Sequence, residues 1–500
     1  FYNRYGFSNT NNFDGLGAFQ PRVSFSYKPL PSLSLRGGIG IFSGGTPDIY
    51  FSNSYGNSGF IQNRISTVNR ATVAAGSTAT ATCAAPYNTG ANAALCAIAL
   101  NGVTGSSIPG AVNTFLASNT ASLLTAPTAS VAPDFRLPSQ TRATLSADYR
   151  LFGVDLGADY VFSKVNQAVT FTDLRSQIVG TLPDGRPRYT FLPTPGAGIQ
   201  TADTNTDIQI GNTSRGRSHI FTLRANKDFA WGLSVGGSYT WQDVKDVSNA
   251  TSSVASSLYA AQASIDPNNA SYGISSNETK WQFKYSVGFD HAFFGDYRTV
   301  VQLFGETRAG QHYSFSMQDT STGRSSVFGT TGNNDRYLLY VPTGLNNPLV
   351  TYAANDTTTA TALDNLINNT QLKNFRGKIA PKNIARARAN TRIDLHLEQE
   401  LPAYVFHSRI SLFADIENLP NLLNKNWGGQ YYTGFPYTSA VVQVTCLNAA
   451  GAALTGVVGS ATNPAGACAK YQYSSFKSPN ETVNTAQSLY LIRVGARFKF

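Results

Sequence analysis

The sequence predicts an all-β protein, a transmembrane antiparallel β-barrel. Apolar and polar residues alternate with a period of two over segments of ten or more residues, which is the length a tilted strand needs to cross a bilayer. The 500 residues include only 38 Lys and Arg and 28 Asp and Glu, against 30 Phe and 25 Tyr, and this composition favours strands over helices. No stretch approaches 18 uninterrupted apolar residues, so the sequence excludes helical membrane spans.

The alternation is clearest in residues 391–401. Ile393, Leu395 and Leu397 fall on one face of the predicted strand, and the residues between them are polar or ionisable. The same rule predicts eleven strands, at 17–28, 32–43, 139–150, 154–171, 217–228, 232–247, 278–291, 297–316, 389–400, 408–418 and 487–500.

The predicted connections alternate between short and long. Short turns are expected at 28–31, 151–153, 229–232, 293–296 and 402–407, and long polar loops at 44–138, 172–216, 248–277, 317–388 and 419–486. Outer-membrane barrels have this asymmetry, with short periplasmic turns and long extracellular loops. Aromatic residues gather at the short-turn rim, where an aromatic girdle belongs: Phe152, Phe229, Trp231, Phe293, Phe294, Tyr297, Tyr404, Phe406 and Phe500.

The ionic face of each strand is expected to line the lumen. An Arg or Lys on the lipid face near the bilayer midplane costs about 2–4 kcal/mol, so a one-residue slip of register is prohibitive. Lys164, Lys227 and His291 are exceptions on the lipid face, and they lie at strand ends. The predicted lumen-facing residues are Arg392, Asp394, His396, Glu398, Arg409, Asp415, Glu417, Arg493 and Arg497.

A soluble β-sandwich or β-propeller is the competing fold. Sandwich strands average about five to six residues, shorter than these, and the sequence has no fixed repeat of about 40–50 residues. Single-chain bacterial barrels have even strand numbers, and an unpaired edge is costly in hydrocarbon. We therefore expect residues 1–500 to be the C-terminal half of a barrel of about 22 strands, with at least one strand before Phe1.

The four cysteines fall as two close pairs in stretches without a strand pattern. Cys83 with Cys96, and Cys446 with Cys468, are predicted to form loop-local disulfides in an oxidising compartment. Aromatic residues with Asn and Gly neighbours in the first and last long loops suit the capture of a sugar or peptide, although packing at the outer rim explains them equally well. These candidate ligand-facing residues are Tyr50, Phe51, Tyr55, Trp427, Tyr431 and Tyr432.

No motif points to catalysis, a metal or a cofactor. The five His are scattered, no Cys-x-x-Cys spacing occurs, and no helix pattern follows Gly38-Ile39-Gly40. Neighbouring carboxylates such as Glu398 and Glu400 lie on one wall, where lumen salt bridges explain them better than an acid/base pair. The net charge of +10 comes from dispersed residues, which favours contact with anionic lipid over nucleic acid. The sequence therefore predicts no enzyme and no cofactor.

Several segments carry a family resemblance. They are 415–424 (DIENLPNLLN) with 426–428 (NWG), 392–395 with 399–402, 36–47, and 491–500, which ends on Phe498 and Phe500 as the C-terminal barrel signal. With these segments the chain resembles the C-terminal barrel portion of TonB-dependent outer-membrane receptors, particularly the Oar-like group.

The resemblance implies energy-coupled uptake of an unidentified ligand across the outer membrane. The expected partners are outer-membrane lipid and lipopolysaccharide, TonB with its inner-membrane complex acting through a region before Phe1, the barrel assembly machinery at the C-terminal strand, and a surface partner or lipoprotein. The family's plug and TonB box do not occur in residues 1–500. A passive porin and a surface adhesion or assembly component remain as alternatives.

Overall fold

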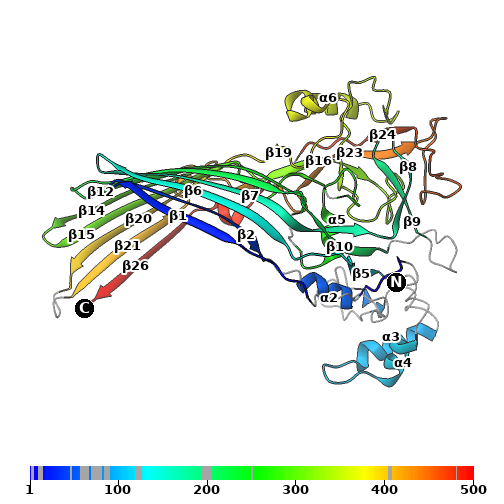
Figure 1. The fold of residues 1–500 in the computed structure, drawn as a ribbon, viewed down its shortest axis with the longest axis horizontal. Helices are drawn as coiled ribbons and strands as arrows, with labels where there is room; N and C mark the ends of the chain where they lie inside the picture. The colour runs from blue at the N-terminus through cyan, green and yellow to red at the C-terminus, as the bar shows by residue number, and fades with distance from the viewer. Residues whose placement is uncertain are drawn as a thin grey trace.

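The computed structural model describes residues 1, 5–9, 15–44, 48–56, 67–68, 82–83, 91–118, 127–192, 205–248, 252–269, 271–403, 408–479 and 481–500. Within these ranges, no helix has the length and apolar character needed to span a bilayer. The chain has two parts: a long sheet, and a body built from the long loops at one end of that sheet (Figure 1). We call the first the wall and the second the loop body.

Eleven antiparallel strands of the described chain form the wall. Their spatial order equals their chain order, so each long strand pairs with the next. β1 and β26 lie at the two ends, and within the described residues they do not pair with each other, so the sheet is not closed. The wall strands are β1 (Arg22–Leu30), β2 (Leu33–Ser43), β6 (Ser139–Leu151), β7 (Val154–Asp173), β11 (Arg217–Asp228), β12 (Leu233–Asp246), β14 (Trp281–Phe294), β15 (Tyr297–Arg308), β20 (Asn390–Pro402), β21 (Arg409–Glu417) and β26 (Leu491–Lys499).

Each wall strand overlaps one predicted range, and the predicted fold class is confirmed as an antiparallel barrel-type sheet. The prediction of one strand over 297–316 was wrong, because β15 ends at Arg308 and β16 (His312–Asp319) joins a different sheet. The break falls at Gly310. A Cβ added there would lie 2.1 Å from the Ala387 carbonyl oxygen, so the chain bends where only glycine fits.

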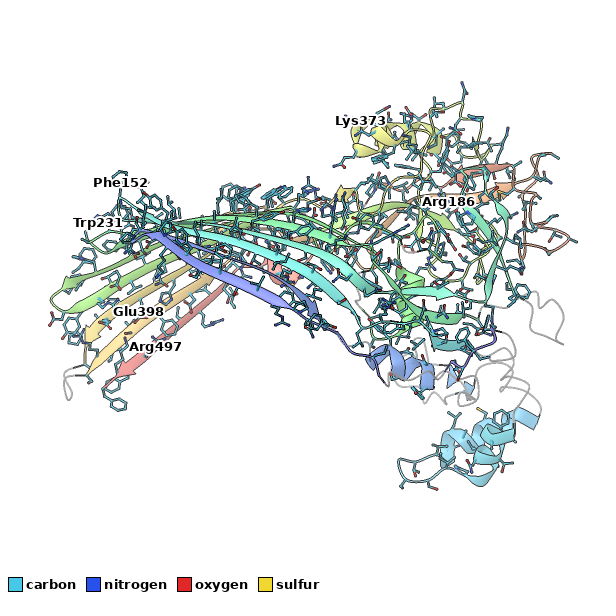
Figure 2. The ribbon with its side chains drawn as sticks, in the orientation of Figure 1. Phe152, Arg186, Trp231, Lys373, Glu398 and Arg497 are labelled. Carbon is cyan, nitrogen blue, oxygen red and sulfur yellow. A yellow bond between two sulfur atoms is a disulfide. The ribbon has the colours of Figure 1, made fainter. Side chains whose placement is uncertain are left out.

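The short turns follow from backbone chemistry. Leu151 pairs with Val154, which leaves a two-residue loop with Phe152 at φ 51° and Gly153 at φ 70°. Positive φ at both positions is the type I′ geometry that matches the twist of a hairpin. Phe152 and Trp231 lie exposed at this rim (Figure 2). The predicted turn at 402–407, with Tyr404 and Phe406, falls mainly outside the described residues.

One face of the wall is apolar and uncovered. Its exposed side chains come from almost every wall strand, and a soluble monomer rarely leaves so large an apolar surface in water. They include Ile39, Leu145, Leu156, Leu223, Val235, Phe283, Val287, Leu397, Leu412, Ile492, Val494 and Phe498. The opposite face carries the ionisable residues, as the alternation predicts, and Glu398 and Arg497 lie on β20 and β26 (Figure 2).

The loop body contains its own sheets. Its largest has the order β17–β16–β23–β24–β18 with β19 beside β16, and it mixes parallel and antiparallel pairs. β7 continues beyond the wall and pairs with β10, which in turn pairs with β5. The remaining strands are β3 (Thr67–Val68), β4 (Thr82–Cys83), β5 (Thr128–Val131), β8 (Ser176–Thr181), β9 (Pro187–Phe191), β10 (Asp207–Thr213), β13 (Gly273–Ile274), β17 (Tyr337–Leu338), β18 (Val350–Tyr352), β19 (Ala385–Arg386), β22 (Tyr431–Tyr432), β23 (Thr438–Leu447), β24 (Lys470–Ser474) and β25 (Thr482–Val483).

Among the described residues, two apolar cores hold the loop body together. The larger one packs β16, β23 and β24 around fully buried Met317, Val441 and Tyr471. The smaller one joins β5, β10, the end of β7 and α5 around Ile208 and Ile210. The helices are α2 (Asp48–Gly56), α3 (Ala91–Gly102), α4 (Gly110–Ser118), α5 (Ala255–Ala261), α6 (Thr359–Asn369), the 3₁₀ helix η1 (Gln371–Phe375), α7 (Leu419–Leu423) and α8 (Thr485–Ser488).

Candidate functional site

The ionic face of β20, β21 and β26 is a cross-strand network. Arg392 donates from Nε to Asp394 Oδ1 (2.9 Å) and from Nη2 to Glu417 Oε2 (2.8 Å). Arg493 on β26 donates to the other oxygen of Glu417 (3.1 Å). One carboxylate thus joins two arginines from two strands, which fixes their side chains on one face.

The network continues along the same strands. His396 Nδ1 lies 2.6 Å from Asp415 Oδ1, and His396 Nε2 lies 3.6 Å from Glu398. Arg497 Nη1 is 3.8 Å from Glu398. The predicted charged residues of β20, β21 and β26 therefore share one face, while their facing a lumen stays a prediction because the sheet is open.

Glu400 belongs to this face and forms salt bridges, as the sequence analysis expects of Glu398 and Glu400, but its partners were not predicted. Arg409 Nη1 (3.1 Å) and Lys499 Nζ (3.1 Å) both donate to its carboxylate, and the side chain is only 7% exposed. Its position in the alternation, two residues after Glu398, was the available signal. Its burial could not be known before the neighbouring strands were in register.

A second ionic cluster lies farther along the same face, and the sequence analysis did not predict it. Arg224 of β11 contacts both Asp148 of β6 and Asp159 of β7, and Asp148 also pairs with Arg36 of β2. Four strands thus contribute two cations and two anions to one chain of contacts. The parity of each residue in its strand predicts the face, but only the register brings these four together.

A pocket of about 320 Å³ opens on the ionic face between β15, β20, β21 and β26. Phe304 provides an apolar wall, and Arg392, His396, Asp415 and Arg493 provide groups of both signs. A mixed-sign lining suits the side chains of a packed partner segment or a zwitterionic solute more than a simple ion.

The first group of candidate loop aromatics does not form one ligand-facing surface. Tyr50 is buried at 7% exposure, its ring packs edge-on against Phe171 with centroids 5.4 Å apart, and its hydroxyl donates to the Ser252 carbonyl (3.1 Å). This position makes Tyr50 a core residue, because apolar contacts from two segments surround it. Tyr55 is exposed at 47%, and the side chain of Phe51 lies outside the described part.

The second group lies around the start of β26. Trp427 is 57% exposed and Tyr432 is 39% exposed, so both rings are accessible. Tyr431 is partly buried: its backbone N–H donates to Asn390 Oδ1 (2.8 Å), and the Arg388 guanidinium lies 4.9 Å from its ring centroid. Trp427 and Tyr432 remain candidates for ligand contact or for the outer aromatic girdle.

The Asn-rich segment that carries the resemblance is a clamp between β21 and β26. Asn418 follows β21 in the left-handed conformation (φ 53°) and donates from Nδ2 to the carbonyls of Gly428 (3.0 Å) and Ser488 (2.7 Å). Asn421 Nδ2 donates to the Trp427 carbonyl (3.1 Å). Asn tolerates positive φ and supplies side-chain donors, which explains its use here.

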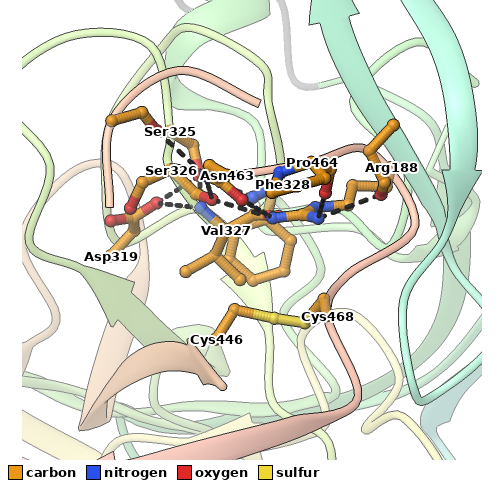
Figure 3. Close-up of a disulfide and its surroundings, with 12 residues drawn as sticks. Arg188, Asp319, Ser325, Ser326, Val327, Phe328, Cys446, Asn463, Pro464 and Cys468 are labelled. Atoms are coloured by element: carbon orange, nitrogen blue, oxygen red, sulfur yellow. Dashed lines mark hydrogen bonds between the residues drawn. A yellow bond between two sulfur atoms is a disulfide. The ribbon is translucent and has the colours of Figure 1, made fainter. Parts of the chain in front are cut away.

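The predicted Cys446–Cys468 disulfide is confirmed, with Cα atoms 5.5 Å apart (Figure 3). Cys446 lies in β23 and not in a strand-free loop as predicted, so the bond ties a core strand to the segment that leads into β24. Cys96 is buried in α3, and the side chain of Cys83 lies outside the described residues, so the first pairing stays a prediction.

Arg188 of β9 fastens the loops above this disulfide (Figure 3). Its guanidinium is fully buried and donates to the carbonyls of Val327 (3.0 Å), Pro464 (3.0 Å) and Ala465 (3.0 Å), and to Asn463 Oδ1 (2.6 Å). Burial lowers the pKa of Arg188 to about 10, which still leaves the side chain charged at neutral pH. Arg186, two residues earlier, is also buried in this body (Figure 2).

Among the described residues, no group of three or more His, Cys, Asp or Glu is placed to hold a metal ion. At the end of the wall, Phe498 and Phe500 are exposed with ring centroids 6.2 Å apart, Phe498 on the apolar face opposite Ile410. A long antiparallel wall with one bare apolar face, one ion-paired face, short turns at one rim and folded loops at the other defines an outer-membrane barrel protein.

The family comparison agrees with this class. The family described as "Outer membrane beta barrel domain" matches residues 3–428, and the chain belongs to this family, which places it in the outer membrane. No curated protein matches the chain.

Three solved structures match most of the chain at low sequence identity. A mutant of the ferric enterobactin receptor PfeA from Pseudomonas aeruginosa has 10% identity and a TM-score of 0.37, over 96% of this chain and 40% of the receptor. The FrpB iron transporter from Neisseria meningitidis has 8% identity and a TM-score of 0.32, over 80% of this chain and 34% of the transporter. The siderophore receptor PirA from Acinetobacter baumannii has 9% identity and a TM-score of 0.35, over 80% of this chain and 36% of the receptor. The chain therefore spans at most 40% of the length of these proteins.

Proposed function

We propose that the chain is the barrel part of an outer-membrane transporter that takes up a ligand by TonB-dependent coupling, within the Oar-like group. The ligand is left unassigned. The family match supports the membrane location, and the segments 415–424 and 36–47 support the group.

One observation favours a receptor over a passive porin. The long loops fold together into a body with a buried apolar core that includes Met317, Val441 and Tyr471, so they are not independent, irregular loops. A folded body at the rim can present a selective surface, whereas a porin needs an unobstructed entrance. Trp427, Tyr55 and Tyr432 are the candidate contact residues on it.

The ion pairs on the ionic face are consistent with a lumen that is filled by a plug. Arg392, Arg493 and Glu417 form fixed pairs, and the pocket beside them presents groups of both signs. Such a surface is suited to polar contact with a plug that moves during transport.

The wall is proposed to form half of a barrel of about 22 strands. β1 and β26 each leave one edge of backbone groups unpaired within the described chain. Each such group costs several kcal/mol in hydrocarbon, so further strands must satisfy them in the membrane.

Planar bilayers and a binding assay test the proposal. The full-length protein should show no steady large conductance, and it should bind the purified periplasmic domain of TonB. Large open conductance without TonB binding would establish the porin alternative and remove the import function. Loss of surface attachment on deletion of 44–138, with uptake unchanged, would favour the adhesion alternative.

A further inference from the structure

A hollow of about 920 Å³ lies in the wall between β6, β7, β11, β12 and β14, lined mainly by apolar surface. Its floor consists of four small residues that the register places side by side in two pairs. Ala147 pairs with Ala158, and Ala225 pairs with Gly237. All four occupy the apolar face, where the neighbouring wall strands carry Leu, Val, Tyr and Phe. The hollow is therefore a gap in the lipid-facing side chains.

The surrounding rings keep this gap open. A Cβ added at Gly237 would meet, among the described atoms, only the Lys284 carbonyl oxygen at 3.6 Å, so the space above this residue is empty. Tyr285, which pairs with Gly237, does not fill it, because its ring lies over Gly305 on the other side: a Cβ there would be 2.0 Å from Tyr285 Cε2. Tyr239 and Phe283, with ring centroids 4.6 Å apart, form another wall.

The side chain of Lys227 lies at the end of the hollow nearest the short turns. Lys227 lines it, one residue before the end of β11, with its Nζ 3.5 Å from the Phe152 carbonyl oxygen and 5.0 Å from the Phe229 ring centroid. In the part of the chain that the structure describes, the hydrogen-bond acceptor of this Nζ is the Phe152 carbonyl oxygen, and Lys227 forms no ion pair with a carboxylate. The ammonium group is thus at the depth of the membrane interface, next to apolar space, with its charge uncompensated.

We propose that the hollow binds one anionic glycerophospholipid of the periplasmic leaflet, with an acyl chain over Ala225 and Gly237 and the phosphate on Lys227. The shape accounts for the chain, since small residues create space that only apolar groups occupy in hydrocarbon. The charge accounts for the headgroup, since a phosphate is the anion found at that depth. The volume is in the range of about 300–1,000 Å³ that small-molecule sites have. The inference rests on the membrane location and on the short turns facing the periplasm, and it does not depend on transport.

Native mass spectrometry of the full-length protein with dioleoyl phosphatidylglycerol tests the site. Ala225→Phe places a ring where the acyl chain is proposed to lie, and Lys227→Gln removes the charge. Ala143→Phe is the matched control, because Ala143 faces the same way on β6, beside Ile39 and Phe162, but lies outside the hollow. Wild type and Ala143→Phe should retain one tightly held lipid, Ala225→Phe should lose it, and Lys227→Gln should bind it about fivefold more weakly.

Either of two results in these binding measurements overturns the proposal. One is equal retention of the lipid by Ala225→Phe and Ala143→Phe, both shown to be folded by circular dichroism and by gel mobility without heating. The other is binding of neutral dioleoylglycerol by wild type as tightly as phosphatidylglycerol, which would mean an apolar crevice without headgroup recognition. Should Ala225→Phe fail to fold, photo-crosslinking of wild type with a diazirine-tailed phosphatidylglycerol decides. Labels concentrated on β11 and β12 support the site, and labels spread evenly over the apolar face overturn it.

Discussion

Replacing Leu397 by arginine tests which face of the wall meets lipid. Leu397 is on the apolar face, 39% exposed, between Val301 and Ala414 of the neighbouring strands. It lies five residues before Pro402, the last residue of β20. At about 3.3 Å per residue this is roughly 16 Å of strand, and a tilt of about 45° places the side chain about 12 Å into an apolar band about 25 Å tall.

Leu397 is thus near the midplane, where an arginine costs about 2–4 kcal/mol. The expected loss of folding free energy corresponds to a roughly 30- to 900-fold shift toward the unfolded state. His396→Arg is the matched control, because the new guanidinium would have Asp415 and Glu398 beside it on the ionic face. Its stability should stay within about 1 kcal/mol of wild type.

The assay is guanidinium unfolding of the full-length protein in dilauroyl phosphatidylcholine vesicles, followed by tryptophan fluorescence. The reasoning is refuted if Leu397→Arg is as stable as wild type, or if both variants lose the same free energy. Either outcome would mean that the apolar face and the ionic face of the wall have similar surroundings. The assignment of the apolar face to lipid would then be wrong.

Three further predictions concern the loop body. Arg188→Met removes the donor from five acceptors and should destabilise this body by about 3 kcal/mol or more, measured as faster limited proteolysis. Unchanged cleavage would contradict this role of Arg188. The double substitution Cys446→Ser with Cys468→Ser removes a disulfide between residues 22 positions apart. Thermal unfolding should show that the free energy of unfolding falls by about 3 kcal/mol. A fall of less than about 1 kcal/mol would contradict a stabilising role of the disulfide. Hydrogen bonds from Thr359 and the Ser475 N–H hold the pKa of Asp356 well below its usual value. The start of α6 should therefore keep this stabilisation above the ordinary carboxyl pKa of 3.8 and lose it as pH falls. The protection factor of the Thr359 amide should fall with pH in wild type and stay constant in Asp356→Asn.

The wall could be predicted closely because its signal is local. In β20, each residue's face follows from its parity, and a change of face would put Arg392 and Asp394 into hydrocarbon. The turn at 152–153 could also be predicted, because a two-residue loop with glycine between two alternating segments indicates a β-hairpin. The end of β15 was not, because the bend at Gly310 depends on the Ala387 backbone, 77 positions away in the chain.

The candidate site was predicted only in part. The charges of β20, β21 and β26 share one face, but the sequence could not identify Arg409 and Lys499 as the partners of Glu400. Tyr50 looked like a loop aromatic, and its burial against Phe171 comes from a segment about 120 residues away. Composition could not separate a core aromatic from an exposed one in these loops.

The sequence alone determined the strand-forming segments, the two chemically distinct faces and the rim with short turns, because each of these follows from side-chain periodicity within about ten residues. Tertiary structure decided how the loops fold into one body and where the wall leaves a hollow. Arg188 meets Asn463 across 275 positions, and Ala225 meets Gly237 only through the register of β11 and β12. Contacts of that kind depend on which surfaces pack together, and no local pattern in the chain encodes them.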